Sequence, residues 1–149
     1  MTSQAFTRIL VGVDDSPAAM AAARLAIRVA ASSGGCIRFV NVLSDGELTQ
    51  ALTLMQHDGG LQERRSAAAA GLLRHVAGEA DRAGVPADTV SLNGQPAAIL
   101  LAQARDWAAD LVVLGRADVR GPGHPFVGTV TRHVLEFSER PVLVVPRPL

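Results

Sequence analysis

Short apolar runs alternate with longer helix-like stretches along the whole chain, and no other feature limits its fold as strongly. The predicted strands are residues 8–13, 36–43, 88–93, 111–114 and 141–145. The predicted helices run from Ser16-Pro17 to Gly34-Gly35 and over residues 61–83, 96–107 and 129–137. Strands of this length that alternate with helices build a parallel sheet covered on both faces. The sequence therefore predicts an α/β fold in which one domain, residues 1–149, holds an open five-stranded parallel sheet.

The composition excludes several kinds of chemistry. All fourteen basic residues are arginine, so a Walker-type phosphate lysine, a Schiff-base lysine and a lysine general base are ruled out. The formal net charge is zero and aromatic residues make up 3% of the chain, which argues against a nucleic-acid partner. No apolar run is long enough to span a bilayer, so we expect no membrane association.

Cysteine usage and the N-terminus indicate a cellular compartment. Cys36 is the only cysteine, and a single cysteine cannot form an internal disulfide. The first residues lack the charged and apolar parts of a signal peptide. We therefore expect a cytoplasmic protein, with Cys36 as a buried and inert thiol at the start of a strand.

A glycine-containing segment near the C-terminus indicates an anion-binding site. The predicted strand 111–114 leads into Gly115 and a polar loop, and Gly128-Thr129 opens the last helix. Glycines let a ligand approach the backbone closely, and the N–H groups and dipole of a helix N-terminus favour a phosphate. Parallel sheets bind ligands at the carboxyl ends of strands, where the strand order reverses. If the first and fourth strands are neighbours there, Asp14 and Gly115 face each other across a crevice.

The chain resembles the universal stress protein family over almost its whole length. The matching segments are ILVGVDDSPAA at 9–19, FVNVL at 39–43, GQPAAILLAQARDWAADLVVLG at 94–115 and GTVTRHVLEFSERPVLVVP at 128–146. ATP-binding members carry a motif of three glycines followed by Ser or Thr. Here Gly115 and Gly128-Thr129 fill its ends at the preserved spacing, while Asp118 occupies the middle position. The resemblance implies a Rossmann-like fold of the adenine nucleotide alpha hydrolase type that commonly forms dimers.

The resemblance also implies a set of nucleotide-binding residues and their roles. Asp14 would contact the ribose, the backbone of Val42 would read the adenine edge, and the start of the last helix would hold the phosphates. The implied site consists of Gly12, Val13, Asp14, Val42, Leu114, Gly115, Asp118, Gly128, Thr129 and Val130. The implied ligand is ATP, with or without Mg²⁺ or Mn²⁺, and the alternatives are AMP, cyclic AMP or no nucleotide.

Three functions remain open at this point. The leading one is a regulatory, stress-response protein that binds ATP without efficient catalysis, since no nucleophile is visibly paired with a base. In the second, the carboxylate of Asp118 repels a triphosphate, and the protein is a dimeric interaction module that binds no nucleotide. In that case Thr129 would only cap the last helix. The third and lesser alternative is a slow ATPase.

Two further predictions concern the surface. The last strand, with its flanking prolines at 141–146, is apolar on both faces and is expected to be covered on both sides. It is also expected to lie at an edge of the sheet, where unpaired backbone groups invite another chain, so we predict a homodimer through this strand. Residues 44–60 follow the strand that carries Val42 and are the predicted lid.

Overall fold

The structure, a computed structural model, describes residues 6–43, 59–116 and 127–148 of the 149-residue chain. Strands and helices alternate along it, as the sequence predicts. In chain order the elements are β1 (Arg8–Gly12), α1 (Pro17–Ser33), β2 (Cys36–Leu43), α3 (Gly59–Arg82), β3 (Ala87–Asn93), α4 (Pro96–Asp106), β4 (Leu111–Gly115), α5 (Thr129–Phe137) and β5 (Val142–Val145).

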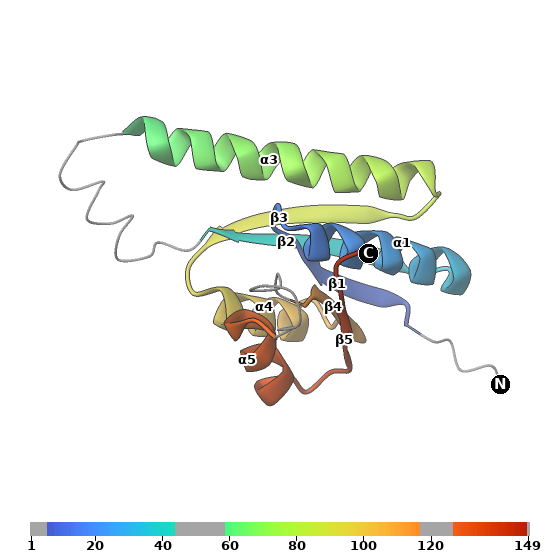
Figure 1. Cartoon of the computed structure of the whole chain (residues 1–149). Helices are drawn as coiled ribbons and strands as arrows, with labels where there is room; N and C mark the ends of the chain where they lie inside the picture. Colours follow the sequence, from blue (N-terminus) through green and yellow to red (C-terminus); the bar gives the residue numbers. More distant parts are fainter. Residues whose placement is uncertain (1–5, 44–58, 117–126, 149) are drawn as a thin grey trace.

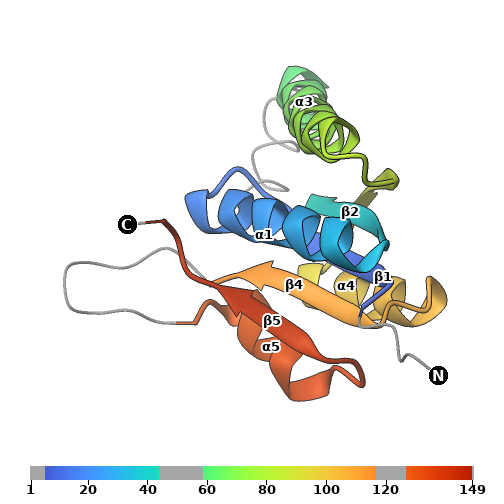
Figure 2. The ribbon, with the colours of Figure 1, turned by 90° about the vertical axis from the view of Figure 1, so that its right-hand side faces the viewer.

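All strand pairs in the described sheet are parallel, and the strand order is β3-β2-β1-β4-β5. The chain moves outward from β1 through β2 to β3 and then returns to the other side of β1. Because crossovers between parallel strands are right-handed, this reversal of direction also reverses the face on which the helices lie. Accordingly α1 and α3 cover one face and α4 and α5 the other (Figures 1 and 2). The predicted open parallel sheet with helices on both faces is confirmed.

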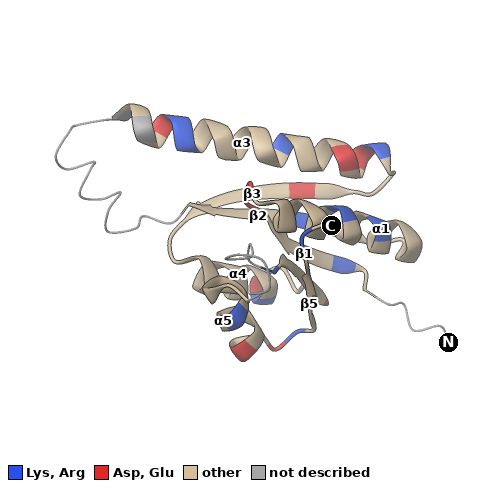
Figure 3. Cartoon of the chain, viewed as in Figure 1, with Lys and Arg blue, Asp and Glu red and all other residues tan. Residues whose placement is uncertain are grey.

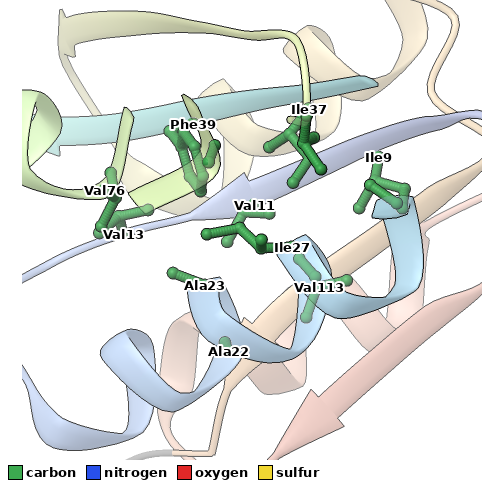
Figure 4. Packing of buried hydrophobic residues seen from close by; sticks show 14 of the residues in the cluster. Ile9, Val11, Val13, Ala22, Ala23, Ile27, Ile37, Phe39, Val76 and Val113 are labelled. Atoms are coloured by element: carbon green, nitrogen blue, oxygen red, sulfur yellow. The ribbon is translucent and has the colours of Figure 1, made fainter. Parts of the chain in front are cut away.

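The core has one layer on each side of the sheet. On the α1 side, Val11, Val113 and Phe39 pack against the small side chains of α1, and Figure 4 shows this layer from close by. The central strands β1 and β4 are buried along most of their length. Charged residues lie mostly on the helices and in the connections, and few lie on the strands (Figure 3). This distribution is typical of a parallel sheet enclosed between two helical layers.

Alanines dominate the buried face of α1. Its buried residues are Ala18, Ala19, Ala22, Ala23, Ala26, Ile27 and Ala30. Small side chains let the helix axis come close to the sheet, so the strand side chains fill most of the space between the two layers.

The ends of α1 follow the predicted capping pattern. The hydroxyl of Ser16 accepts a hydrogen bond from the N–H of Ala19 at 3.1 Å, and Pro17 occupies the first turn. At the other end Gly34 adopts the left-handed conformation with φ 68°, and its N–H donates to the carbonyl of Ala30. The chain can therefore turn directly into β2.

The first turn of α1 rests on the end of β4 at Gly115. A Cβ atom placed on Gly115 would lie 2.6 Å from the carbonyl carbon of Ala18 and 2.7 Å from the nitrogen of Ala19. Both contacts are with backbone, which cannot swing away as a side chain can. The absence of a side chain at Gly115 is therefore a requirement of helix-on-strand packing, whatever else this residue does.

The prediction that the last strand is covered on both sides agrees with its contacts. Strand β5 lies at the edge of the sheet, as expected, and it packs against α1 on one face and α5 on the other. Because its outer edge is open, Val142, Leu143 and Val144 are only half-buried and Val145 alone is buried. The prediction of a buried Cys36 is wrong, because this residue is half-buried.

The element boundaries differ from the predicted ones by at most two residues, as is usual at element ends. No helix among the described residues is both long and apolar enough to cross a membrane. The predicted lid, residues 44–60, lies outside the described residues except for its last two positions, which belong to α3.

Replacing Gly115 by alanine should destabilise the protein by about 1–3 kcal/mol, because the new methyl group overlaps the backbone of α1. The matched control is Gly78→Ala in α3, where a Cβ meets nothing closer than an arginine nitrogen at 3.6 Å. That change should stabilise the helix by about 0.5–1 kcal/mol. Urea denaturation of both variants measures the difference, and equal midpoints would contradict the close-packing argument.

Candidate functional site

A cavity of about 390 Å³ opens where the strand order reverses, at the carboxyl ends of β1 and β4. This volume is typical of a pocket for a small molecule. Nine of the ten predicted site residues line it: Gly12, Val13, Asp14, Val42, Leu114, Gly115, Gly128, Thr129 and Val130. The tenth, Asp118, lies outside the described residues. The structure thus brings together residues from β1, β2, β4 and the start of α5.

The end of β1 is held by hydrogen bonds on both sides of Val13. The N–H of Val13 donates to the carbonyl of Val40 at 2.9 Å, and its carbonyl accepts from the side-chain amide of Asn41 at 2.8 Å. Asn41 is buried, and its other side-chain atom, Oδ1, has no hydrogen-bond partner among the described residues. These contacts fix the backbone directly before Asp14.

Asp14 is exposed at the rim of the cavity. One oxygen of its carboxylate accepts the N–H of Ser16 at 2.8 Å, which orients the side chain. The second oxygen has no partner among the described residues, so it remains able to accept a hydrogen bond from a hydroxyl.

The end of β4 is tied to both neighbouring elements. The carbonyl of Gly115 accepts a hydrogen bond from the hydroxyl of Thr131 at 3.0 Å, and the N–H of Arg116 donates to the carbonyl of Val145 at 2.7 Å. Thr131 is one of two buried polar residues in the described core. The N-terminus of α5 is therefore held beside the end of β4.

The first turn of α5 offers backbone N–H groups to the cavity. Gly128 is the N-cap in an extended conformation, and no side chain caps the helix among the described residues. The interpretation of Thr129 as a structural cap is wrong, because Thr129 is already the first helical residue. A helix start without a side-chain cap leaves N–H groups that an anion can accept.

The inner wall of the cavity is apolar. Val40 and Val42 project from β2, and Leu100 projects from α4 onto the gap left by Gly12. A Cβ atom on Gly12 would lie 2.6 Å from the side chain of Leu114. This wall suits a flat apolar ring, while the polar groups lie toward Asp14 and the start of α5.

Several residues of the cavity wall were missed in the sequence. They are Ser16, Ala19, Val40, Pro96, Leu100, Arg116 and Thr131. Val40 could have been found from Val42, because residues two apart on a strand share a face. Pro96 and Leu100 could not, since their position depends on α4 crossing from β3 back to β4. Among the described residues no group of three or more His, Cys, Asp or Glu side chains could hold a metal ion.

Comparison with known proteins decides the family. The family model described as the universal stress protein family matches residues 5–146. The chain belongs to this family. Universal stress protein YxiE of Bacillus subtilis is 25% identical to it over 146 residues, which cover 94% of this chain and 99% of YxiE.

Solved structures share the fold of this universal stress protein. The structure of hypothetical protein MJ0577 superposes with a TM-score of 0.81 at 20% identity, covering 96% of this chain and 97% of that one. A universal stress protein in complex with cAMP gives 0.69 at 21% identity, covering 97% and 99%. The universal stress protein of Archaeoglobus fulgidus in complex with dAMP gives 0.65 at 20% identity, covering 93% and 97%.

Two threonines on the same helix should respond differently to the same chemical change. Thr131→Val removes the hydroxyl of a buried residue that donates to the carbonyl of Gly115 and should destabilise the protein by about 1–3 kcal/mol. Thr129→Val removes an exposed hydroxyl that has no partner among the described residues and should leave stability within about 0.5 kcal/mol. Thermal denaturation compares them, and equal losses would show that the Thr131 bond does not anchor α5.

Proposed function

We propose that this universal stress protein binds an adenine nucleotide, with ATP as the leading ligand, in the cavity between β1 and β4. The observation that carries the proposal is the convergence on one cavity of an apolar wall, an oriented carboxylate and an uncapped helix N-terminus. These three features match the base, the ribose and the phosphates of a nucleotide. They come from four elements that lie far apart in the sequence.

The proposed roles follow the geometry of the cavity. The adenine ring lies against the apolar wall near Val42, whose backbone reads its edge. The free oxygen of Asp14 accepts a hydrogen bond from a ribose hydroxyl. The phosphates lie at the start of α5, where the N–H groups and the helix dipole favour negative charge. The hydroxyl of Thr129 provides an additional donor there.

Related structures support an adenine nucleotide as the ligand class. Two structures with the same fold are complexes with cAMP and dAMP. Both contain an adenine base, a sugar and one phosphate. AMP and cyclic AMP are therefore the closest alternatives to ATP for this protein.

The proposed role is regulatory rather than catalytic. No described side chain in the cavity is a nucleophile beside a general base, and the described residues of its lining include no histidine, cysteine or lysine. We expect the bound nucleotide to change the state or the partner of a cytoplasmic protein during stress. Slow hydrolysis of ATP, with Mg²⁺ or Mn²⁺ on the phosphates, is the lesser alternative.

The second candidate is an interaction module of the same family that binds no nucleotide. It is favoured by Asp118, which stands in the sequence where ATP-binding members have the middle glycine of their motif. A carboxylate at that position repels a triphosphate. Because Asp118 lies outside the described residues, this argument rests on the sequence alone.

Replacing Asp118 by glycine should raise the affinity for ATP, since it removes a negative charge from the phosphate segment. The measurement is a calorimetric titration of both proteins with ATP, ADP, AMP and cyclic AMP, with and without Mg²⁺ or Mn²⁺, while phosphate release is followed. Binding by the natural protein without turnover supports the leading function. No binding by the natural protein supports the interaction module, and steady phosphate release supports the ATPase.

We further propose a homodimer in which β5 pairs with its counterpart in a second copy. Strand β5 pairs only with β4 among the described strands, so its outer edge has unpaired backbone groups. Its neighbour α5 carries the exposed apolar side chains of Leu135 and Phe137. An exposed edge strand beside exposed apolar side chains suits an isologous contact.

The variant Val144→Pro tests this pairing. The carbonyls of Pro141 and Val145 face β4, so by strand alternation the N–H of Val144 points to the free edge. Proline there removes an outward donor and spares the bonds to β4, and it should convert the dimer to a monomer at micromolar concentration. Light scattering measures the mass, with Val144→Thr as the control that keeps the N–H. A monomeric natural protein would contradict the proposal.

A further inference from the structure

Arg116, the residue directly after β4, lines the cavity and was not among the residues that the family resemblance implies. It is half-buried, and its Nε is buried without a hydrogen-bond partner among the described residues. The guanidinium of an arginine is a fixed cation and offers five N–H donors. The cavity therefore has a permanent positive charge in its wall.

The other described arginines differ from Arg116 in this respect. Arg38, for example, is paired with Asp88 at 2.9 Å, and this carboxylate raises the pKa of Arg38. Arg8 donates to the carbonyl of Trp107, and Arg140 donates to that of Ala109. Arg116 forms no ion pair with a described carboxylate, and no other described arginine has a buried nitrogen without a partner. A buried donor of a cationic group without a partner is unfavourable, so an anion that accepts from the guanidinium would be favoured here.

The backbone at Arg116 is fixed from three sides. Its own N–H is bonded to β5, and the carbonyl of the preceding residue, Gly115, is bonded to Thr131 of α5. Gly115 also packs directly on the backbone of α1. The side chain therefore starts from a fixed backbone beside α5, so this part of the backbone requires little ordering when a ligand binds.

We propose that Arg116 is a specificity-determining residue that binds phosphate oxygens and makes the affinity of this site rise with the number of phosphates. This inference rests on the proposed nucleotide-binding function. The N–H groups of α5 hold a phosphate through partial charges, whereas a guanidinium adds a full charge and several donors in one plane. In a chain without lysine, Arg116 is the described side-chain cation in the wall of the cavity.

The test compares Arg116→Gln with Arg132→Gln. Both variants lose one positive charge, but Arg132 is exposed on α5 and does not line the cavity. Calorimetric titration with ATP, ADP, AMP and adenosine should show that Arg116→Gln weakens ATP binding about tenfold to a hundredfold. The loss should be smaller for AMP and absent for adenosine. Arg132→Gln should bind all four ligands like the natural protein.

Other outcomes overturn the inference in distinct ways. An equal loss for adenosine and ATP would mean that Arg116 only supports the shape of the site. An equal loss of ATP binding in both variants would mean that long-range charge is responsible. If Arg116→Gln unfolds, Arg116→Lys is the second variant, because it keeps the positive charge without the planar set of N–H donors. An unchanged preference for ATP over AMP in that variant would reject phosphate recognition by the guanidinium. If the natural protein binds neither adenosine nor any nucleotide, the proposed function itself is wrong.

Discussion

The contact between the backbone of α1 and the end of β4 is the constraint on which the rest of this structure depends. Gly115 has no side chain, so Ala18 and Ala19 can lie directly against it. This contact brings the connection after β1 and the connection after β4 to the same point of the sheet. A crevice lies between these two connections, because the strand order reverses there. The connection after β1 leads to α1 on one face of the sheet, and the connection after β4 leads to α5 on the other face. A bulkier residue at position 115 would separate these two connections.

Two buried polar side chains hold the crevice in shape. Asn41 binds the carbonyl of Val13, and Thr131 binds the carbonyl of Gly115. The first bond joins β2 to the residue directly after β1, and the second joins α5 to the last residue of β4. In a low-dielectric interior such bonds are costly to break, because a backbone carbonyl would be left unpaired. The site is therefore built mainly from oriented backbone, with few side chains available for chemistry.

The sequence predicted the helices and strands better than it predicted which residues pack around each of them. The bounds of α5 at residues 129–137 and of β2 at 36–43 agree with the structure, because glycine, proline and apolar runs mark element ends locally. The strand order could not be predicted from the sequence. Because the position of α4 depends on that order, the contribution of Leu100 to the cavity could not be predicted either. Arg116 was overlooked as a site residue for a related reason. Whether an arginine after a strand is buried depends on the elements that pack around it, and no local pattern encodes that.

The alanine face of α1 has a consequence for the ways in which this sequence can change. In most helices one aliphatic residue can replace another of similar polarity. On the face of α1 that packs against the sheet, the volume of the side chain limits which residues can be accepted. Valine or leucine there would suit the chemistry of the interior but would lift the helix from β1 and β4. At the alanine positions of this face, variation should therefore run among alanine, glycine and serine, whereas position 27 already holds isoleucine.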